Sequence, residues 1–201
     1  MSIHTESKKQ SKDIIAREAL KLFVNQGYHH TSIPDIVKAA GLSTGSVYHH
    51  FHGKEQLARY IHDLASKEFT KRFNAKVKTK ELFCEQLNAF VRMMFEWDDE
   101  DPVMVKYLIT DRPVEILNRP TTVCSEGGMS LIGEMVSNGM TSQQLNVDNY
   151  FMAISLISGS IIHFVNLKND GFVQGDLSSK ADDFAKHITR SLCREDCRED
   201  S

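Results

Sequence analysis

The sequence predicts an all-α protein of about nine helices, and three observations support this fold class. Apolar residues recur with the three- and four-residue spacing of an amphipathic helix along nearly the whole chain. No stretch alternates polar and apolar residues strongly enough to indicate a β-strand. Glycine, proline and small polar residues stand where the helical spacing is interrupted, as helix caps and turns require. We therefore expect helices packed on helices.

Capping signals set the limits of the helices at the N-terminal end. Gly27 can adopt the left-handed conformation that ends a helix. Ser32 can cap the next helix, which has Pro34 in its first turn, and Ser43 can cap a third short helix after a tight turn. The predicted helices are 7–26, 33–40, 44–50, 54–77, 79–97, 102–110, 126–138, 147–168 and 177–193.

Charge is distributed unevenly along the chain, although its net value is only −3. Residues 1–80 contain 14 Lys+Arg against 7 Asp+Glu and seven of the nine histidines, whereas residues 81–201 contain 10 against 20. This asymmetry indicates a basic module that meets a polyanion, joined to an acidic body. Lys8, Lys9 and Lys12 are expected to form a flexible basic lead, which either touches the polyanion or only keeps the chain soluble.

The composition is that of a soluble globular protein, with 41% hydrophobic and 25% charged residues. We find no N-terminal signal pattern, and the near-apolar run 151–165 is expected to be too short to span a bilayer. Cys84, Cys124, Cys193 and Cys197 lack the paired spacing of a disulfide framework or a zinc site. We therefore expect reduced, idle thiols in a cytoplasmic protein that does not enter a membrane.

Residues 33–50 have the pattern of a helix-turn-helix, two short helices joined by a turn that contains glycine. Apolar residues such as Ile36 and Val47 can close a small core with the first helix. The third helix leaves small and hydrogen-bonding side chains outside, which suits a helix that enters the major groove of DNA. Gly45 and Ser46 are poor helix formers, so close approach to DNA explains them better than helix stability does.

The segment TSIPDIVKAAGLSTGSVYHHFHGKEQL, residues 31–57, resembles the N-terminal signature of the TetR family of bacterial transcriptional regulators. The resemblance covers about residues 10–60. It depends on several spaced elements, namely Ala40-Gly41-Leu42-Ser43, Gly45, Tyr48, Phe51 and Lys54-Glu55-Gln56-Leu57. His52 and Gly53 depart from the pattern and weaken the expected cap of the fourth helix.

The resemblance implies both a domain organisation and a function. It implies a helix-turn-helix DNA-binding domain over 1–54 and a helical ligand-binding and dimerisation domain over 55–201, with the fourth helix, 54–77, linking them. The implied function is a ligand-responsive, sequence-specific transcriptional regulator, most often a repressor. A small-molecule inducer would release such a repressor from a palindromic operator in double-stranded DNA.

Candidate DNA-binding residues cluster around the third helix. The resemblance implies that Tyr48 and His49 hydrogen-bond phosphates. Lys54 opposes the dipole of the fourth helix, so an external phosphate would be favoured beside it; the alternative is a solvated lysine balanced by Glu55. The full set of candidates is Thr31, Ser32, Ser43, Thr44, Gly45, Ser46, Tyr48, His49 and Lys54.

Three histidines, His49, His50 and His52, lie within four positions and raise the alternative of a metal site. His49 and His50 are adjacent on a helix, so their side chains point about 100° apart and share one metal poorly. We find no nucleophile elbow, phosphate loop or carboxylate-histidine motif. We therefore expect no catalytic residue, metal or cofactor, and keep two alternatives: a metal-dependent enzyme that uses these histidines, and a non-specific architectural DNA-binding protein.

The predicted helix 147–168 is apolar nearly all round, so it must be buried on two sides. A partner subunit can cover the second side, and the small residues Ser155, Ser158, Gly159 and Ser160 would permit close approach. Together with the helix over 177–193, this helix could build the four-helix interface of a homodimer, as the resemblance implies.

Methionine and aromatic residues concentrate in the helices of the body, where the resemblance implies an inducer cavity. Ordinary core packing could also explain most of them. The acidic run 98–101 could attract a divalent cation, or serve only for capping and solvation. The candidate ligand-binding residues are Met94, Trp97, Tyr107, Arg112, Met129 and His163.

Overall fold

The computed structural model describes residues 3–110 and 129–195, and it places side chains from residue 9 onward, residues 110 and 129 excepted. This part of the chain is all-helical, with nine α-helices, one short 3-10 helix and no strand beyond an isolated bridge between Leu145 and Cys193. The predicted fold class is confirmed. The helices are α1 (Ile3–Gln26), α2 (Ile33–Ala40), α3 (Thr44–His50), α4 (Lys54–Lys76), α5 (Phe83–Glu100), α6 (Pro102–Thr110), α8 (Met129–Thr141), α9 (Tyr150–Asn169), η2 (Ser178–Lys180) and α10 (Ala181–Leu192).

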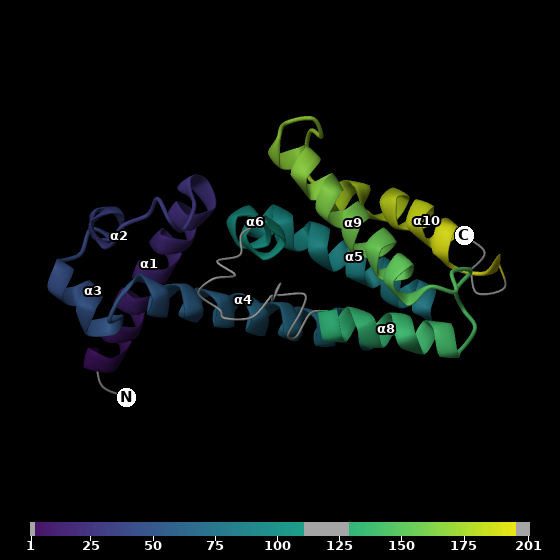
Figure 1. Ribbon diagram of the computed structural model, residues 1–201, viewed down its shortest axis with the longest axis horizontal. Coiled ribbons are helices and arrows are strands. Elements are labelled where there is room, and N and C mark those ends of the chain that lie inside the picture. The colour runs from purple at the N-terminus through teal and green to yellow at the C-terminus, as the bar shows by residue number, and fades with distance from the viewer. Residues whose placement is uncertain (1–2, 111–128, 196–201) are drawn as a thin grey trace.

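Helices α1, α2 and α3 form a compact group at one end of the molecule (Figure 1). Their shared core consists of apolar residues that are almost fully buried, among them Phe23, Ile36, Val47 and Phe51. We call this group the reader. Helix α4 leaves the reader and runs beneath the helices of the body, where α5 packs against α6, α8, α9 and α10.

The two short helices of the reader are held by the caps that the sequence predicts. The Ser32 hydroxyl accepts a hydrogen bond from the Asp35 N–H at 3.3 Å, and the Asp35 carboxylate accepts one from the Ser32 N–H at 2.9 Å. Gly41 ends α2 with a φ of 64°, in the left-handed region that glycine adopts without strain. The Ser43 hydroxyl accepts from the Ser46 N–H at 3.1 Å and begins α3.

The start of α4 lacks a capping side chain at Gly53, as expected. A different contact orders the turn instead, because the Gln56 side-chain oxygen accepts a hydrogen bond from the His52 N–H at 2.7 Å. The path from α3 into α4 is therefore fixed by a glutamine in the first turn of α4 rather than by the cap residue.

The prediction of a flexible basic lead is wrong, because α1 begins at Ile3 and includes Lys9 and Lys12. The Lys12 ammonium lies 4.0 Å from the centroid of the Tyr60 ring, a cation–π contact that joins α1 to α4. The side chain of Lys8 lies outside the described residues.

The acidic run at the end of α5 has two roles: Asp101 caps α6, as the sequence predicts, whereas Asp98 and Asp99 form ion pairs instead of being solvated. Helix α5 continues through Asp98 and Asp99, because both carboxylates bind the Lys168 ammonium of α9 at 2.7 Å. Asp99 also accepts the N–H groups of Leu177 at 3.0 Å and Ser178 at 2.8 Å, so it holds the start of η2. Only Asp101 interrupts the helix.

Helix α9 has 20 residues and is, by length and composition alone, able to cross a membrane; no other helix in the described part of the chain passes this test. The expectation that this apolar segment is too short to span a bilayer is therefore wrong, because the helix extends beyond the run 151–165. Ala153, Ile157 and Val165 are buried on one side of α9, which packs against α5, α6, α8 and α10. A core helix of this length has the same composition.

Two of the four cysteines lie in the described residues, and both Cys84 and Cys193 are buried. Cys124 and Cys197 lie outside them, so the idle pair predicted at Cys193 and Cys197 stays a prediction.

Candidate nucleic-acid interface and ligand cavity

Helix α3 presents small and hydrogen-bonding side chains to the outside. Thr44, Gly45 and His49 are exposed, and the Tyr48 side chain is 48% exposed although it is large and aromatic. Ser46 is half-buried. Because Val47 fixes the inner side of the helix, these groups all point away from the reader core. A helix of this kind can bring hydroxyl, imidazole and phenol groups to base edges and phosphates.

His50 packs against its neighbours, whereas the side chain of His52 is exposed. The half-buried His50 ring lies 5.2 Å from the His49 ring and 6.5 Å from the Phe51 ring, between centroids. Among the residues that the structure describes, no group of three or more His, Cys, Asp or Glu side chains is arranged to hold a metal ion.

Two predicted DNA-binding serines use their hydroxyl groups as helix caps. The Ser43 hydroxyl accepts from a backbone N–H, which leaves its own proton available for a phosphate. The Ser32 hydroxyl donates to the Asp35 carboxylate at 2.5 Å, so its proton is engaged. The same hydrogen bond lowers the pKa of Asp35. Ser43 is therefore the better placed phosphate donor of the two.

Thr31 lies inside the reader rather than on its surface. Thr31 is 0% exposed, and its hydroxyl donates a hydrogen bond to the Gly27 carbonyl at 2.8 Å. The Gln26 side-chain amide donates to the same hydroxyl at 3.3 Å. Thr31 thus ties the end of α1 to the start of α2, and this placement disfavours the predicted contact between its side chain and a phosphate.

Lys54 is held by the turn between α1 and α2. Its ammonium donates to the carbonyls of Tyr28 at 2.7 Å and Thr31 at 2.8 Å, and lies 4.1 Å from the centroid of the Tyr28 ring. Glu55 pairs with Arg59 at 2.8 Å instead, so the alternative of a solvated lysine balanced by Glu55 is wrong. A phosphate contact stays a prediction, and it would use the remaining N–H of this partly buried group.

Replacing Lys54 by alanine should therefore destabilise the reader as well as change DNA binding. Two hydrogen bonds from a charged donor are lost together with a cation–π contact. Because Lys54 is only partly buried, water replaces part of these interactions, and we expect the free energy of unfolding to fall by about 2 kcal/mol. Urea unfolding measures this change. Lys67→Ala removes an exposed lysine from the same helix and serves as the control. Equal stability of the two variants would contradict the structural role.

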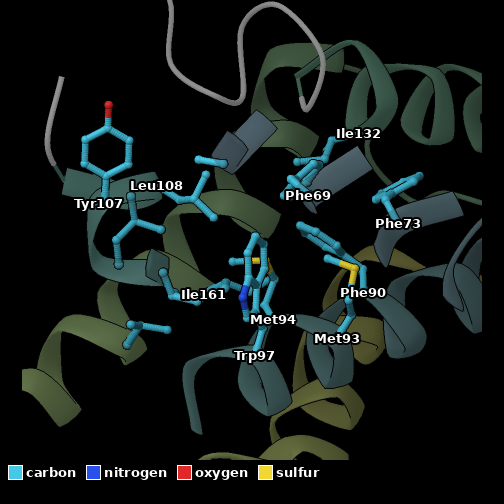
Figure 2. Close-up of a cluster of buried hydrophobic side chains, with 14 of the residues drawn as sticks. Phe69, Phe73, Phe90, Met93, Met94, Trp97, Tyr107, Leu108, Ile132 and Ile161 are labelled. Atoms are coloured by element: carbon cyan, nitrogen blue, oxygen red, sulfur yellow. The ribbon is translucent and has the colours of Figure 1, made fainter. Parts of the chain in front are cut away.

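A cavity of about 20 Å³ lies in the body among α4, α5, α6, α8 and α9. Its walls are almost entirely apolar, and Figure 2 shows several of the side chains that form them. Six of these apolar residues are Phe69, Phe90, Met94, Leu108, Ile132 and Ile161. Ser158 of α9 is the polar residue in the described lining.

The predicted ligand-binding residues are only partly gathered at this cavity. Met94 lines it, whereas Trp97 and Tyr107 are buried in the surrounding core without being part of its described wall. His163 is exposed on the other side of α9. Arg112 and the side chain of Met129 lie outside the described residues. The ligand-binding role of these residues stays a prediction.

The residues missed by sequence reasoning include Phe69, Leu108, Ile132 and Ser158. They come from four helices, and their sequence environment resembles that of ordinary core residues. Ser158 belongs to a group of small residues expected to face a partner helix, but it faces inward while Ser155 and Gly159 are exposed. The uniform apolar character of α9 hides which side is buried.

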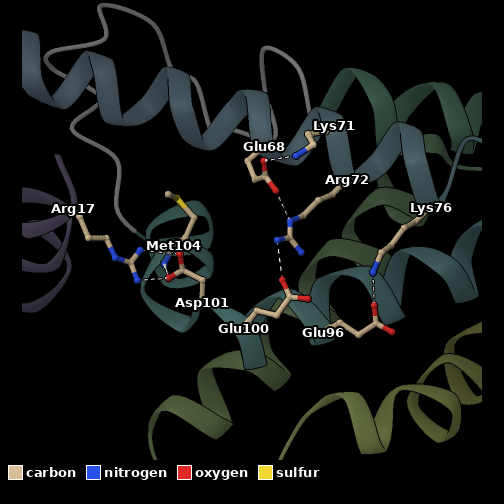
Figure 3. Close-up of polar contacts among 9 residues, drawn as sticks. All are labelled: Arg17, Glu68, Lys71, Arg72, Lys76, Glu96, Glu100, Asp101 and Met104. Atoms are coloured by element: carbon tan, nitrogen blue, oxygen red, sulfur yellow. Dashed lines mark hydrogen bonds and ion pairs between the residues drawn. The ribbon is translucent and has the colours of Figure 1, made fainter. Parts of the chain in front are cut away.

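An ion pair connects the cavity helix α6 to the reader (Figure 3). The Arg17 guanidinium of α1 donates to both oxygens of Asp101, at 2.7 and 2.9 Å. Asp101 caps α6 by accepting the Met104 N–H at 3.1 Å. Because Leu108 and Ile109 of α6 line the cavity, one short helix contacts both the cavity and α1.

Ion pairs also fix α4 against α5, as Figure 3 shows. Arg72 of α4 pairs with Glu100 at 2.8 Å and lies over the Trp97 ring, 4.8 Å from its centroid. Lys76 pairs with Glu96 one turn further along. These contacts join α4 to α5 along two turns.

Comparison with known proteins gives a family for this arrangement. The family described as bacterial regulatory proteins, tetR family, matches residues 15–61. The chain is 33% identical over 98 residues to the uncharacterised HTH-type transcriptional regulator YuxN of Bacillus subtilis, covering 45% of this chain and 33% of that protein. It is 37% identical over 75 residues to the HTH-type transcriptional repressor ComR of Escherichia coli, covering 37% and 33%. The matched part thus spans about a third of each relative's length.

Solved structures extend the likeness to the body. The transcriptional regulator FadR from Bacillus subtilis, in complex with stearoyl-CoA, is similar with a TM-score of 0.72 and 20% identity, over 87% of this chain and 96% of that one. At this identity the likeness concerns the fold. Capped α2 and α3 on a helical body define a helix-turn-helix protein. Residues 15–61, which contain the helix-turn-helix, match the tetR family of bacterial regulatory proteins, and the described chain shares its fold with solved structures of such regulators.

Proposed function

We propose that the chain is a ligand-responsive, sequence-specific transcriptional repressor that acts as a homodimer on a palindromic operator in the cytoplasm. The observation that carries this proposal is α3: its outer side offers small and hydrogen-bonding groups on a helix that caps and core packing hold in place. The relative ComR is described as a repressor, which supports the direction of regulation. Residues 1–54 would form the DNA-binding domain and residues 55–201 the ligand-binding and dimerisation domain, with α4 linking them.

The roles on α3 follow from position and chemistry. Tyr48 and His49, exposed toward the end of the helix, would hydrogen-bond phosphates and fix the orientation of the reader. Thr44, Gly45 and Ser46, in its first turn, would approach base edges in the major groove, because the N-terminal residues of a recognition helix contact the bases.

Dimerisation would use the outer face of α9, together with α10. Phe151 is 74% exposed, Met152 56% and Leu156 42%, and together they form an apolar strip on the exposed side of α9. Ser155 and Gly159 lie beside them and would let a second helix approach closely. Contiguous exposed apolar surface of this kind marks an interaction site. A two-fold dimer would present two copies of α3 about one DNA turn apart.

The response to ligand would pass through α6. A ligand that enlarges the cavity would press on Leu108 and Ile109 of α6, and the residue that caps α6, Asp101, holds Arg17 of α1. Movement of α6 would therefore change the position of the reader relative to the dimer and shift the population away from the DNA-binding arrangement. The stearoyl-CoA bound to the similar FadR structure supports a ligand site in such a body.

Selection of fragments from the source genome by the purified protein tests this function. We expect Tyr48→Ala to weaken binding about tenfold on the selected site and on sites with altered bases alike, because a lost phosphate contact carries no sequence information. Thr44→Ala should instead change the order of preference among altered sites. Fluorescence anisotropy measures both, with Ser137→Ala on the exposed side of α8 as the control.

Two outcomes would contradict the proposal. Failure to retain any fragment at low ionic strength, with no inducer added, would contradict DNA binding altogether. Complete loss of the selected complex to a moderate excess of random DNA would instead favour a non-specific architectural protein, since a specific complex survives such competition.

A further inference from the structure

Ser158 differs from three other serine and threonine residues inside the helices of the body. Ser160, Thr141 and Ser191 each donate a hydrogen bond to the carbonyl four residues earlier, at 2.5, 2.9 and 3.0 Å. This is the usual partner of a hydroxyl within a helix. The Ser158 hydroxyl oxygen is buried and has no hydrogen-bond partner in the described part of the chain.

The surroundings of this hydroxyl make the missing partner significant. Ser158 is the polar member of a wall otherwise made of apolar side chains, and the hydroxyl thus meets the cavity without a protein acceptor. A buried hydroxyl without a partner is unfavourable, because it has lost its hydrogen bonds to water. A ligand group that accepts or donates one hydrogen bond would remove this penalty.

The rest of the wall restricts the charge of the ligand. No Lys, Arg, His, Asp or Glu is among the described residues that line the cavity. An ionised group placed there would lose its hydration without gaining a counter-charge, so carboxylates and ammonium ions are disfavoured. Hydrocarbon groups would instead exchange water for contact with phenylalanine, leucine and isoleucine side chains.

The size of the cavity shows that a ligand must reshape it. A volume of about 20 Å³ holds about one water-sized group. The wall includes Met94, whose unbranched side chain changes shape readily, and Leu108 and Ile109 on the short helix α6. A hydrocarbon chain can displace these side chains, and the displacement acts on the helix that carries Asp101.

We propose that this cavity binds an uncharged, mainly hydrocarbon molecule whose single hydrogen-bonding group meets the Ser158 hydroxyl. Its regulatory meaning rests on the proposed repressor function, whereas the binding itself does not. The proposal assigns the orientation of the ligand to Ser158, and the discrimination between an alcohol and an ion of the same length to the apolar wall.

Calorimetric titration of the full chain with three six-carbon probes tests the ligand class. We expect 1-hexanol to bind, and hexanoate and hexylammonium at neutral pH to bind at least about 100-fold more weakly, because each would bury an unpaired charge. Ser158→Ala should weaken 1-hexanol binding about fivefold to tenfold. The matched variant Ser160→Ala, on the same helix with its hydroxyl engaged by Leu156, should leave binding unchanged.

A thermal unfolding measurement separates a binding role from a structural one. Ser158→Ala removes a hydroxyl without a partner, so its Tm should equal or exceed that of the unmodified chain. A Tm several degrees lower would show that the hydroxyl stabilises the fold, and would overturn the proposal. Equal 1-hexanol affinity of both chains, binding of either ion as tight as that of the alcohol, or no binding of any probe would overturn it too.

Operator binding by the same preparations, measured without probe, keeps this proposal apart from the proposed function. A chain that binds a selected fragment but not 1-hexanol refutes the ligand class alone. A chain that binds 1-hexanol through Ser158 but no DNA refutes the repressor and leaves the cavity assignment standing.

Discussion

Replacing Leu156 by arginine is expected to convert the protein from a dimer to a monomer and to weaken operator binding by at least about 100-fold. Leu156 lies in the exposed apolar strip of α9 with Phe151 and Met152. In a symmetric dimer the substitution would bury two positive charges near each other without counter-charges, a cost of several kcal/mol. DNA binding falls because two joined readers bind a palindrome far more tightly than one reader binds a half-site. Sedimentation equilibrium and fluorescence anisotropy measure the two effects.

The control for this variant adds the same charge elsewhere. Ser137→Arg places an arginine on the exposed side of α8, so it should remain dimeric and bind the operator as the unmodified chain does. A Leu156→Arg protein that stays dimeric would show that the outer face of α9 is not the interface. A monomer that still binds the operator at full affinity would show that binding does not need a dimer.

The reader could be predicted from sequence because its signals are local. Ser32 and Asp35 cap each other across three residues, Gly41 needs only its own backbone conformation, and Ser43 caps the helix that follows it. The bounds of α3 agree with the prediction for this reason. The apolar residues of the reader are also close in sequence, so their helical spacing alone identifies its core.

Polar contacts between distant parts of the chain could not be predicted, because neither partner is visible from the local sequence of the other. Asp98 and Asp99 are explained by Lys168, about seventy residues away, and by the backbone of η2. Lys54 finds its partners 23 and 26 residues earlier, in carbonyl groups that carry no sequence signal. Composition shows that these residues are charged, but it does not show which charges meet.

The candidate sites show the same division. The exposure of Tyr48 and His49 follows from the helical periodicity of α3. The roles of Thr31 and Lys54 depend instead on hydrogen bonds to the turn after α1, which the sequence does not reveal. Helix α9 is apolar on both sides, so its sequence did not reveal that Ser158 faces the cavity. Which side of a uniformly apolar helix is buried depends on the elements that pack against it.

Replacing Lys168 by methionine should lower the free energy of unfolding by about 3 kcal/mol at neutral pH. Asp98 is 0% exposed, and the Lys168 ammonium, which contacts one of its oxygens at 2.7 Å, is the cation that the structure places beside it. Methionine keeps most of the packing volume of the lysine stem but leaves the carboxylate buried without a counter-charge. Removal of one partner from a buried pair costs roughly 3–5 kcal/mol, and the partial exposure of Lys168 places our value at the lower end.

The pH dependence of this loss identifies its cause. Burial raises the pKa of Asp98 even in the presence of Lys168, so the pKa should rise further in the variant. The folded variant then takes up a proton more readily than the unfolded chain, and its deficit in stability should shrink as the pH falls from 7 toward 5.

Asp99 behaves oppositely. Burial raises its pKa, but hydrogen bonds from Lys168 and from the Ser178 and Leu177 N–H groups outweigh this effect and lower the pKa to about 2. Its contribution is present above the unfolded value of 3.8 and disappears as the pH falls toward 2.

Urea unfolding between pH 7 and pH 5 therefore separates the two carboxylates, because Asp99 is ionised throughout this window. The double variant Asp98→Asn with Lys168→Met removes the buried charge together with its partner, and should recover at least half of the lost stability without a dependence on pH. A loss below about 1 kcal/mol in the single variant, or a loss that is the same at both pH values, would mean that the Asp98 carboxylate does not need the lysine. The packing of α5 against α9 would then depend on apolar contacts alone.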